Sequence, residues 1–284
     1  MNKSDTLPQA ILFDLDDTIL AYDSVSKGVW RAVCHRFGQR LDGFDPDELF
    51  RAIQEYRMWY WGDPERHRRA RLNLILARRE VAAGAFDLLG IDDPELAVEI
   101  GEAHAIQRDE EVQPFPGALD TLRRLKDHGV RLALVTNGAG DVQRAKAERF
   151  DLARFFDAIV IEGEFGVGKP DERVYRHALD RIGSQPTEAW MVGDNLEWEV
   201  AAPQRLGMLG IWVDSRDEGL PEATTIRPDR IIKALPELLH LEIISKGRWR
   251  IPTHPSSGVF VLGGTSPRPL ARGESPSGLP EHGF

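Results

Sequence analysis

The feature that most constrains the fold is a short apolar segment that ends abruptly in acidic residues. The segment Ile11–Thr18 reads Ile-Leu-Phe-Asp-Leu-Asp-Asp-Thr. A short apolar run with polar residues at its end is typical of a buried strand, and a strand of a parallel sheet is covered on both faces. The acids then follow the carboxyl end of the strand, the edge where open α/β sheets bind their ligands. The segment therefore predicts a parallel α/β sheet with a ligand site at its carboxyl edge.

Two of these acids, Asp14 and Asp16, are predicted to face one crevice. Side chains two residues apart in an extended segment point the same way, so Leu15 between them points into the core. Two carboxylates this close repel each other unless a cation lies between them or one of them is protonated. Oxygen ligands suit a hard cation such as Mg²⁺. The segment alone also allows a second interpretation, an acidic turn, because Asp and Thr are common in turns.

The composition is typical of a soluble globular protein. The 284 residues, 42% of them hydrophobic, are enough for one large domain or two modest ones. A formal net charge of -10 argues against nonspecific binding to nucleic acid, which needs a basic face. Cys34 is the single cysteine, so no internal disulfide is possible, which fits a reducing compartment.

No targeting segment is predicted. Residues 1–9 lack the pattern of a signal peptide, and no apolar run is long enough to span a bilayer. We therefore expect a cytoplasmic protein without a membrane or nucleic-acid partner, and the oligomeric state stays open.

A block of helices is predicted to interrupt the sheet after its first strand. Apolar residues recur at three- and four-residue spacing from about Ser24, and no convincing strand occurs before Glu111. One of the helices is predicted to run without a break from about Glu65 to Leu89. We assign residues 23–112 to an inserted all-helical domain, whose size is compatible with a small domain of its own.

After this block, strands and helices alternate in the way that indicates a parallel sheet with crossover helices. Strands are predicted at residues 130–135, 158–161, 189–192 and 209–213. Residues 1–22 and 113–245 are assigned to a Rossmann-like α/β core. The tail, residues 246–284, is dense in Gly, Pro and Ser and is predicted to be disordered or loosely attached.

Polar groups suited to phosphoryl transfer follow three of the predicted strands and one glycine-rich loop. A carboxylate can attack phosphorus and form an aspartyl phosphate, and a neighbouring acid can protonate the leaving oxygen. A lysine, a hydroxyl and backbone N–H groups can hold the phosphate oxygens, and Mg²⁺ can offset the repulsion between the nucleophile and the phosphate. Each group alone has a plainer interpretation, as a turn, a surface lysine or a helix cap, but their order favours one site. The residues are Asp14 and Asp16, Thr136 and Asn137, Asp194 with Glu199, and Lys169 in the loop.

Four motifs in this order resemble those of the haloacid dehalogenase-like hydrolase superfamily. They are Asp14–Thr18, Val135–Gly138, Gly168–Pro170, and Gly193–Asp194 with Glu199. The match covers roughly residues 10–241, and the helical block resembles the type I cap of this superfamily. The resemblance implies a Rossmann-like core, a mobile helical cap and Mg²⁺-dependent phosphatase activity.

The resemblance also implies a role for each site residue. Asp14 would be the nucleophile and Asp16 the general acid and base. Glu199 stands where many members have Asp, so we expect it to contact other site residues rather than the metal or the substrate. The remaining expected contacts are phosphate with Thr136, Asn137 and Lys169, and the metal with Asp14, Asp194 and the backbone carbonyl of Asp16.

The predicted function is a Mg²⁺-dependent phosphomonoester hydrolase for a small metabolite, either a nucleotide or a sugar phosphate. A phosphosugar mutase on the same scaffold and a non-catalytic binding protein remain alternatives. A dehalogenase is disfavoured because displacement of halide needs no second acid such as Asp16. The aromatic run Met58–Trp61 and the basic run Arg66–Arg71 could contact substrate, but we favour an apolar core and a solvated face. The scattered histidines receive no role.

Overall fold

The computed structural model of the chain describes residues 7–41 and 43–240. The predicted tail, residues 246–284, lies outside the described residues, and so do residues 241–245 at the end of the assigned core. Among the described helices, none combines the length and the apolar character needed to cross a membrane.

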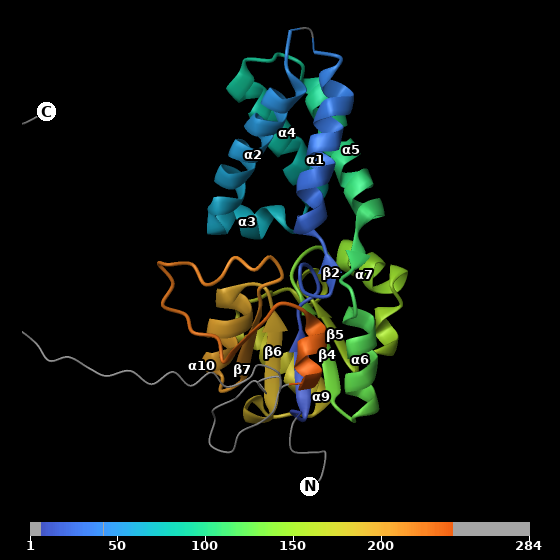
Figure 1. Cartoon of the computed structure of the whole chain (residues 1–284), viewed down its shortest axis with the longest axis vertical. Helices are drawn as coiled ribbons and strands as arrows, with labels where there is room; N and C mark the ends of the chain where they lie inside the picture. Colours follow the sequence, from blue (N-terminus) through green and yellow to red (C-terminus); the bar gives the residue numbers. More distant parts are fainter. Residues whose placement is uncertain (1–6, 42, 241–284) are drawn as a thin grey trace, which may run out of the picture. The chain divides into compact units, whose positions relative to one another are not determined.

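The core is a six-stranded sheet in which every pair of neighbouring strands is parallel (Figure 1). The strand order is β5-β4-β1-β6-β7-β8, so the first strand lies in the middle. The predicted α/β fold with a Rossmann-like sheet is confirmed, and the four later strands predicted agree with the structure to within one residue. The strands are β1 (Ala10–Phe13), β4 (Arg131–Thr136), β5 (Ala158–Ile161), β6 (Ala189–Gly193), β7 (Leu209–Val213) and β8 (Arg230–Ile232).

Helices cover both faces of this sheet. In β1, Ile11 and Phe13 pack into one apolar cluster together with α6, while Ala10 and Leu12 pack into another together with α9. Burial on both faces is the reason that β1 is a continuous apolar run rather than an alternating one. The helices of the core are α6 (Ala118–Asp127), α7 (Gly140–Arg149), α8 (Glu162–Phe165), α9 (Glu172–Ile182) and α10 (Ala202–Arg205).

Five further helices form an insert at one end of the sheet (Figure 1). The chain enters and leaves the insert through two short antiparallel strands, β2 (Leu20–Ala21) and β3 (Gln113–Pro114). The insert has an apolar cluster of its own, drawn entirely from its helices, with Trp30 and Phe86 among its members. Its helices are α1 (Asp23–Gly38), α2 (Pro46–Gly62), α3 (Pro64–Ala70), α4 (Leu74–Leu89) and α5 (Pro94–Glu111).

The prediction of one unbroken helix from Glu65 to Leu89 is wrong. Helix α3 ends at Ala70 and α4 begins at Leu74. The side chain of Asn73 accepts a hydrogen bond from the backbone N–H of Leu76 at 3.2 Å and so caps α4. Asn favours such caps over the interior of a helix, and the apolar spacing on which the prediction relied does not detect them.

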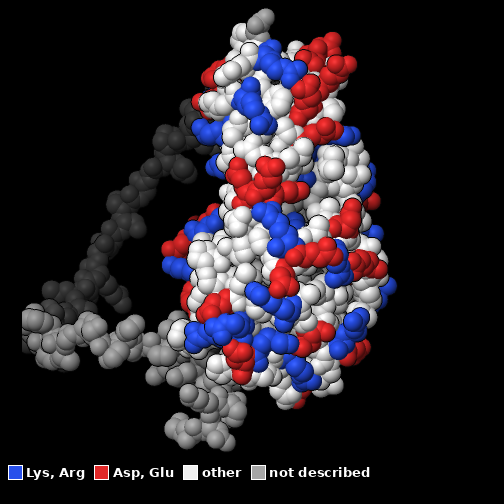
Figure 2. Space-filling view, turned by 90° about the vertical axis from the view of Figure 1, so that its right-hand side faces the viewer, with Lys and Arg blue, Asp and Glu red and all other residues white. Residues whose placement is uncertain are grey.

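Charges of both signs are spread over the surface. Figure 2 shows basic and acidic side chains intermixed on one face of the described part of the chain. Some of the charged residues pair within one helix, as Arg123 does with Asp120 and Asp127 of α6. Exposed pairs of this kind contribute little to stability, about 0.3–0.5 kcal/mol each.

A buried histidine couples the stability of the insert to pH. The ring of His104 in α5 stacks on Trp30 of α1 with 3.8 Å between centroids, and its Nε2 lies 3.1 Å from the hydroxyl of Ser26. Burial lowers the pKa of His104 to about 3. The imidazole therefore stays neutral in the folded state, while the same group in the unfolded chain takes up a proton near its ordinary pKa.

We predict that this histidine makes the protein less stable at mildly acidic pH. Because the unfolded state binds the extra proton, the stabilisation is complete above about pH 6.5 and falls as the pH decreases toward 3. Between pH 7 and pH 5 the free energy of unfolding should fall by about 2 kcal/mol from this group alone. Urea titrations at both pH values should show this loss in wild type and in the exposed-site control His128→Gln, and not in His104→Phe. An equal loss in His104→Phe would assign the effect to other groups.

Candidate active site

The carboxyl ends of the central strands bring the predicted site residues to one edge of the sheet. Phe13 in β1 pairs with Leu134 in β4 and with Val192 in β6, so the residues that follow these strands are neighbours. The backbone N–H of Asp14 donates a hydrogen bond to the carbonyl of Val192 at 3.0 Å. Asp14 is thereby held at the edge, beside the chain that leads to Asp194.

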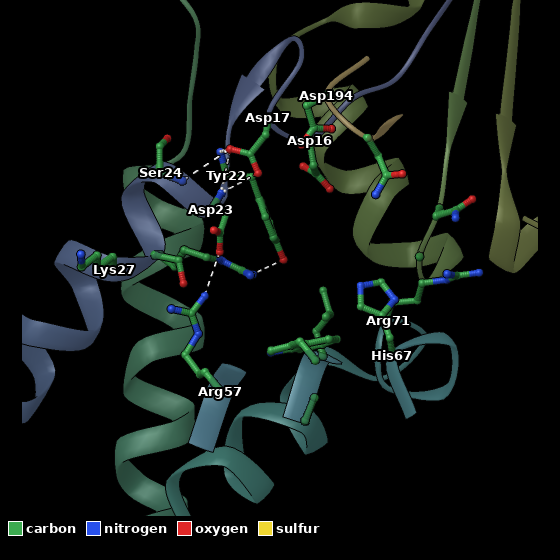
Figure 3. A pocket seen from close by; sticks show the side chains of 18 of the residues that line it. Asp16, Asp17, Tyr22, Asp23, Ser24, Lys27, Arg57, His67, Arg71 and Asp194 are labelled. Carbon is green, nitrogen blue, oxygen red and sulfur yellow. Dashed lines mark hydrogen bonds and ion pairs between the residues drawn. The ribbon is translucent and has the colours of Figure 1, made fainter. Parts of the chain in front are cut away.

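A cavity of about 930 Å³ lies between this edge and the insert (Figure 3). Asp14 and Asp194, which the prediction required to converge, both line it. Thr136 and Lys169 are buried behind the lining residues and contact them, as described below. The predicted site residues that line the cavity are Asp14, Asp16, Asn137, Asp194 and Glu199.

Lys169 is a buried cation between two carboxylates. Its side chain is 1% exposed, and its Nζ lies 2.6 Å from Asp14 Oδ1 and 2.7 Å from Glu199 Oε1. Burial lowers the pKa of Lys169, but the charges of Asp14 and Glu199 outweigh this effect and raise it above its ordinary value. Burial raises the pKa of Asp14, which Lys169 counteracts, and raises that of Glu199 to about 7. One cation shared by two acids thus offsets part of the cost of burying their charges.

Asn137 holds the loop that carries Lys169. Its side-chain Nδ2 donates to the Lys169 carbonyl at 2.8 Å, and its Oδ1 accepts from the Lys169 N–H at 2.8 Å. Both ends of the amide are therefore engaged by the backbone of one residue. Asn137, for which a contact with phosphate was predicted, lines the cavity, and its side chain holds Lys169.

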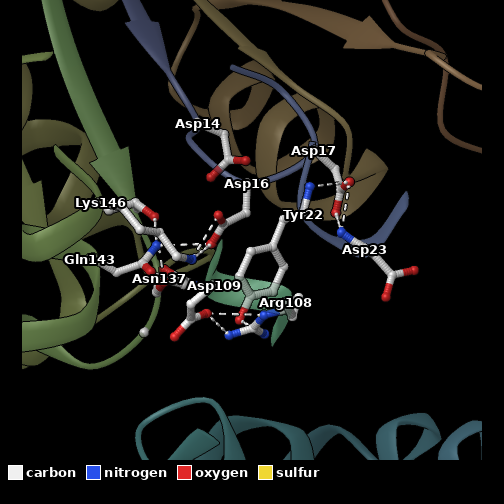
Figure 4. A network of polar contacts seen from close by, with 12 residues as sticks. Asp14, Asp16, Asp17, Tyr22, Asp23, Arg108, Asp109, Asn137, Gln143 and Lys146 are labelled. Carbon is white, nitrogen blue, oxygen red and sulfur yellow. Dashed lines mark hydrogen bonds and ion pairs between the residues drawn. The ribbon is translucent and has the colours of Figure 1, made fainter. Parts of the chain in front are cut away.

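Asp16 is held by residues of α7 (Figure 4). Lys146 Nζ lies 2.8 Å from both carboxylate oxygens, and Gln143 Nε2 donates to Asp16 Oδ2 at 3.0 Å. The same Gln143 amide donates to the hydroxyl of Thr136 at 2.6 Å. Gln143 thus connects Asp16, the predicted acid after β1, with Thr136, the predicted hydroxyl at the end of β4.

Asp17, the third acid of the first segment, stabilises the backbone at the start of α1. It adopts a left-handed backbone conformation with φ of 58°, and its carboxylate accepts hydrogen bonds from the N–H groups of Tyr22, Asp23 and Ser24. These bonds fix the first turn of α1, where the helix leaves backbone donors without partners. Burial raises the pKa of Asp17 to about 6. The acidic segment therefore also determines where the insert begins.

Asp194 lies next to the other acids, and within residues 7–41 and 43–240 no Lys, Arg or His forms an ion pair with it. Its pKa is raised well above the usual value, first by burial and then by the charges of Asp14 and Glu199. Figure 3 shows its carboxylate beside Asp16 at the core side of the cavity. Mutual repulsion of this kind is what a divalent cation relieves.

The insert closes the other side of the cavity through an ion pair with the core. Arg71, which follows α3, binds Glu162 at the end of β5 with two hydrogen bonds of 2.7 and 2.6 Å. Glu162 also accepts from the N–H of Gly138 at 2.9 Å. Nearby, the ring of Trp198 meets His67 edge to face with 5.4 Å between centroids. Arg71 of the basic run, which was assigned to a solvated face, therefore contacts the core instead.

Comparison with known proteins identifies the family. A family model described as haloacid dehalogenase-like hydrolase matches residues 8–207, which is more than half of the chain. The chain belongs to this family. The predicted membership is confirmed, and the predicted phosphatase-type hydrolase agrees with the relatives.

Several relatives match this haloacid dehalogenase-like hydrolase over most of its length. A phosphoserine phosphatase from Thermus thermophilus is 33% identical over 82% of this chain and 99% of its own. A glyceraldehyde 3-phosphate phosphatase from Methanopyrus kandleri is 28% identical over 81% and 98%. The crystal structure of an HAD phosphatase from Thermococcus onnurineus is 25% identical and superposes with a TM-score of 0.51. The match covers 81% of this chain and 95% of that one.

Three polar residues of this hydrolase were not predicted from the sequence, Gln143, Lys146 and Glu162, and a fourth, Arg71, was assigned to a solvated face. Glu162 directly follows β5. The search for polar residues at the carboxyl ends of parallel strands, which found Asp194, could therefore also have found Glu162. Gln143 and Lys146 lie within α7, where polar side chains are usually solvated, and no sequence signal separates them from surface residues. Arg71 comes from the insert, and only the tertiary structure brings it to Glu162.

We predict that the Asn137 amide stabilises this hydrolase by fixing Lys169. Asn137→Ala leaves the N–H and the carbonyl of Lys169 without partners, and should lower the free energy of unfolding by about 1–3 kcal/mol. Asn137→Asp keeps the acceptor but places a carboxylate oxygen against the carbonyl of Lys169, so it should lower the free energy of unfolding by at least as much. Urea denaturation measures both, and wild-type stability in both variants would contradict the proposed support.

Proposed function

We propose that this protein is a Mg²⁺-dependent phosphomonoester hydrolase that forms an aspartyl phosphate on Asp14 and acts on a small metabolite. The observation that carries the proposal is the contact of the Asp14 carboxylate with a buried cation, Lys169, at 2.6 Å, in a cavity that Asp16 also lines. A carboxylate, a cation and a second acid are the groups that phosphoryl transfer requires. The relatives act on different substrates by name, phosphoserine and glyceraldehyde 3-phosphate, so they support phosphoester chemistry without selecting one metabolite.

The reaction has two halves. In the first, an oxygen of Asp14 attacks phosphorus, the bond from phosphorus to the leaving oxygen breaks, and Asp16 gives that oxygen a proton. In the second, water attacks the phosphorus of the aspartyl phosphate, Asp16 takes the proton, and the bond to Asp14 breaks to release inorganic phosphate. Lys169, which contacts Asp14, and the Thr136 hydroxyl, which contacts Gln143, are the proposed partners of the phosphate oxygens. Asp16 must leave Lys146 and Gln143 to act, so these residues hold it in a resting position.

The residues present fit a magnesium ion. Asp14 and Asp194 offer carboxylate oxygens to one cavity, and desolvation followed by the charge of Asp14 raises the pKa of Asp194. Asp14 and Asp194 would hold the ion together with the backbone carbonyl of Asp16 and water, because Mg²⁺ prefers hard oxygen ligands. When bound, the metal offsets the repulsion between the nucleophile and the phosphoryl group.

The insert acts as a cap over the site. It contributes Arg57, His67 and Arg71 to the wall of the cavity opposite the acids (Figure 3). A lid of this kind excludes water during the first half-reaction and opens to release the product. Within the insert, Cys34 is buried, and burial raises its thiol pKa to about 12, so the thiol stays protonated and unreactive.

We predict that Asp14→Asn reduces turnover of phosphomonoesters by about 10³-fold or more, because the amide is a poor nucleophile. The measurement is phosphate release from a panel of phosphorylated metabolites, with circular dichroism as the control for folding. Turnover by a folded Asp14→Asn protein at the wild-type rate would remove Asp14 from the nucleophile role. Release of inorganic phosphate without a bisphosphate activator separates a hydrolase from a mutase.

We predict that EDTA abolishes activity and that excess Mg²⁺ restores it. Because binding only to the folded state stabilises it, Mg²⁺ should also raise the Tm of wild type. Asp194→Asn should lose this rise, while Glu218→Gln, which changes another lining carboxylate, should keep it. Activity that is indifferent to EDTA, together with a Tm that Mg²⁺ leaves unchanged, would exclude the metal.

A further inference from the structure

The two sides of the cavity carry opposite charge (Figure 3). The core side is acidic, with Asp14, Asp16 and Asp194 among its lining residues. The insert side is basic, and of the described insert residues that line the cavity, Asp23 is the single carboxylate. The basic residues that line it from the insert are Lys27, Arg57, Arg71, Arg78 and Arg108.

Most of these cations are paired within the protein. Arg71 binds Glu162, and Arg57 binds Asp23 at 2.8 Å. Arg108 binds its neighbour Asp109, whose side chain is more than half exposed. Carboxylates of the protein therefore compensate the charge of three of the basic residues on the insert side of the cavity.

Arg78 is different, because it is buried without an acid. The residue is 7% exposed, and no carboxylate within residues 7–41 and 43–240 lies within ion-pair distance of it. Its guanidinium donates to the Leu74 carbonyl at 2.7 Å and to the Tyr22 hydroxyl at 3.1 Å, both neutral, and its Nε has no partner among the described residues. A buried charge is costly unless an opposite charge compensates it.

A second guanidinium converges on the same hydroxyl (Figure 4). Arg108 also donates to the Tyr22 hydroxyl, and the ammonium of Lys146 lies 3.7 Å from the centre of the Tyr22 ring. The hydroxyl is neutral, because burial raises the pKa of Tyr22. Three positive groups therefore contact one neutral side chain at the base of the insert. Lys146 and Arg108 also bind the carboxylates of Asp16 and Asp109, so an anion is the partner that Arg78 lacks among the described residues.

We propose that Arg78 is the specificity-determining residue that binds a second anionic group of the substrate, so that the preferred substrates are phosphomonoesters that also carry a carboxylate or a second phosphate. This inference rests on the proposed function, since the phosphate to be hydrolysed occupies the acidic, core side of the cavity. A cavity of about 930 Å³ leaves room for a second group beyond the phosphate. Nucleoside monophosphates and simple sugar phosphates, which lack that group, are poorer substrates.

Matched pairs of substrates test the preference. 3-Phosphoglycerate and glycerol 3-phosphate differ chiefly in a carboxylate, and fructose 1,6-bisphosphate and fructose 6-phosphate differ in a phosphate. For wild type we expect kcat/KM to be at least about tenfold higher for the more anionic member of one pair, as a charge-assisted bond implies. The pair that shows the difference identifies which of the two anionic groups the site takes.

Variants of Arg78 test the residue. Arg78→Met should reduce the ratio of kcat/KM within that pair by about tenfold or more, mainly through KM, and Arg78→Lys should retain part of it. The matched control is Arg79→Met, because Arg79 pairs with Glu102 at the surface and does not line the cavity. Thermal unfolding of each variant checks that the fold is intact.

Binding separates this inference from the proposed function. Calorimetry with the Asp14→Asn protein measures the affinities for 3-phosphoglycerate and glycerol 3-phosphate without turnover. In the double variant Asp14→Asn, Arg78→Met, the affinity for 3-phosphoglycerate should fall, and that for glycerol 3-phosphate should stay unchanged. If wild type hydrolyses no phosphomonoester while this dependence on Arg78 persists, the proposed hydrolysis fails and the anion site stands. If wild type hydrolyses both members of each pair equally, or if Arg78→Met changes the ratio no more than Arg79→Met, the anion site is overturned and the hydrolase stands.

Discussion

The polar side chains at the carboxyl edge of the sheet depend on the ion pairs of the Lys169 ammonium group. It lies between Asp14 at the end of β1 and Glu199 in the π-helical segment Leu196–Ala201. Removing one partner from a buried ion pair costs about 3–5 kcal/mol, because the charge that remains is uncompensated. The contact therefore ties three distant parts of the chain together and, at the same time, places a cation beside the proposed nucleophile.

Two glycines make this arrangement possible, because the acids and the loop approach the backbone closely. A Cβ on Gly193 would lie 2.1 Å from Cγ of Glu199, and one on Gly168 would lie 2.5 Å from Oδ1 of Asn137. Any larger residue would displace either Glu199 or the amide that holds Lys169. The glycines in the two motifs are thus explained by packing, without an appeal to flexibility.

Tyr22 connects the core with the insert. It stands between β2 and α1, its ring contacts Lys146 of the core, and its hydroxyl receives Arg78 and Arg108 of the insert. Asp17 fixes the same turn through its backbone hydrogen bonds. The point where the chain leaves the sheet is therefore also the point where the acidic and basic sides of the cavity meet.

The sequence by itself determined the fold class and most of the acidic side of the site. Apolar runs of strand length, each ending in polar residues, predict both the parallel sheet and its functional edge, because side-chain burial and strand ends are local properties of the chain. The tertiary structure alone decided the rest. It revealed that Asn137 holds Lys169, that α7 holds Asp16, that a cap at Asn73 separates α3 from α4, and that Arg71 and Arg78 of the insert face the core. These features depend on contacts between residues far apart in sequence or on competing local hydrogen bonds, and the spacing of apolar residues carries no information about either.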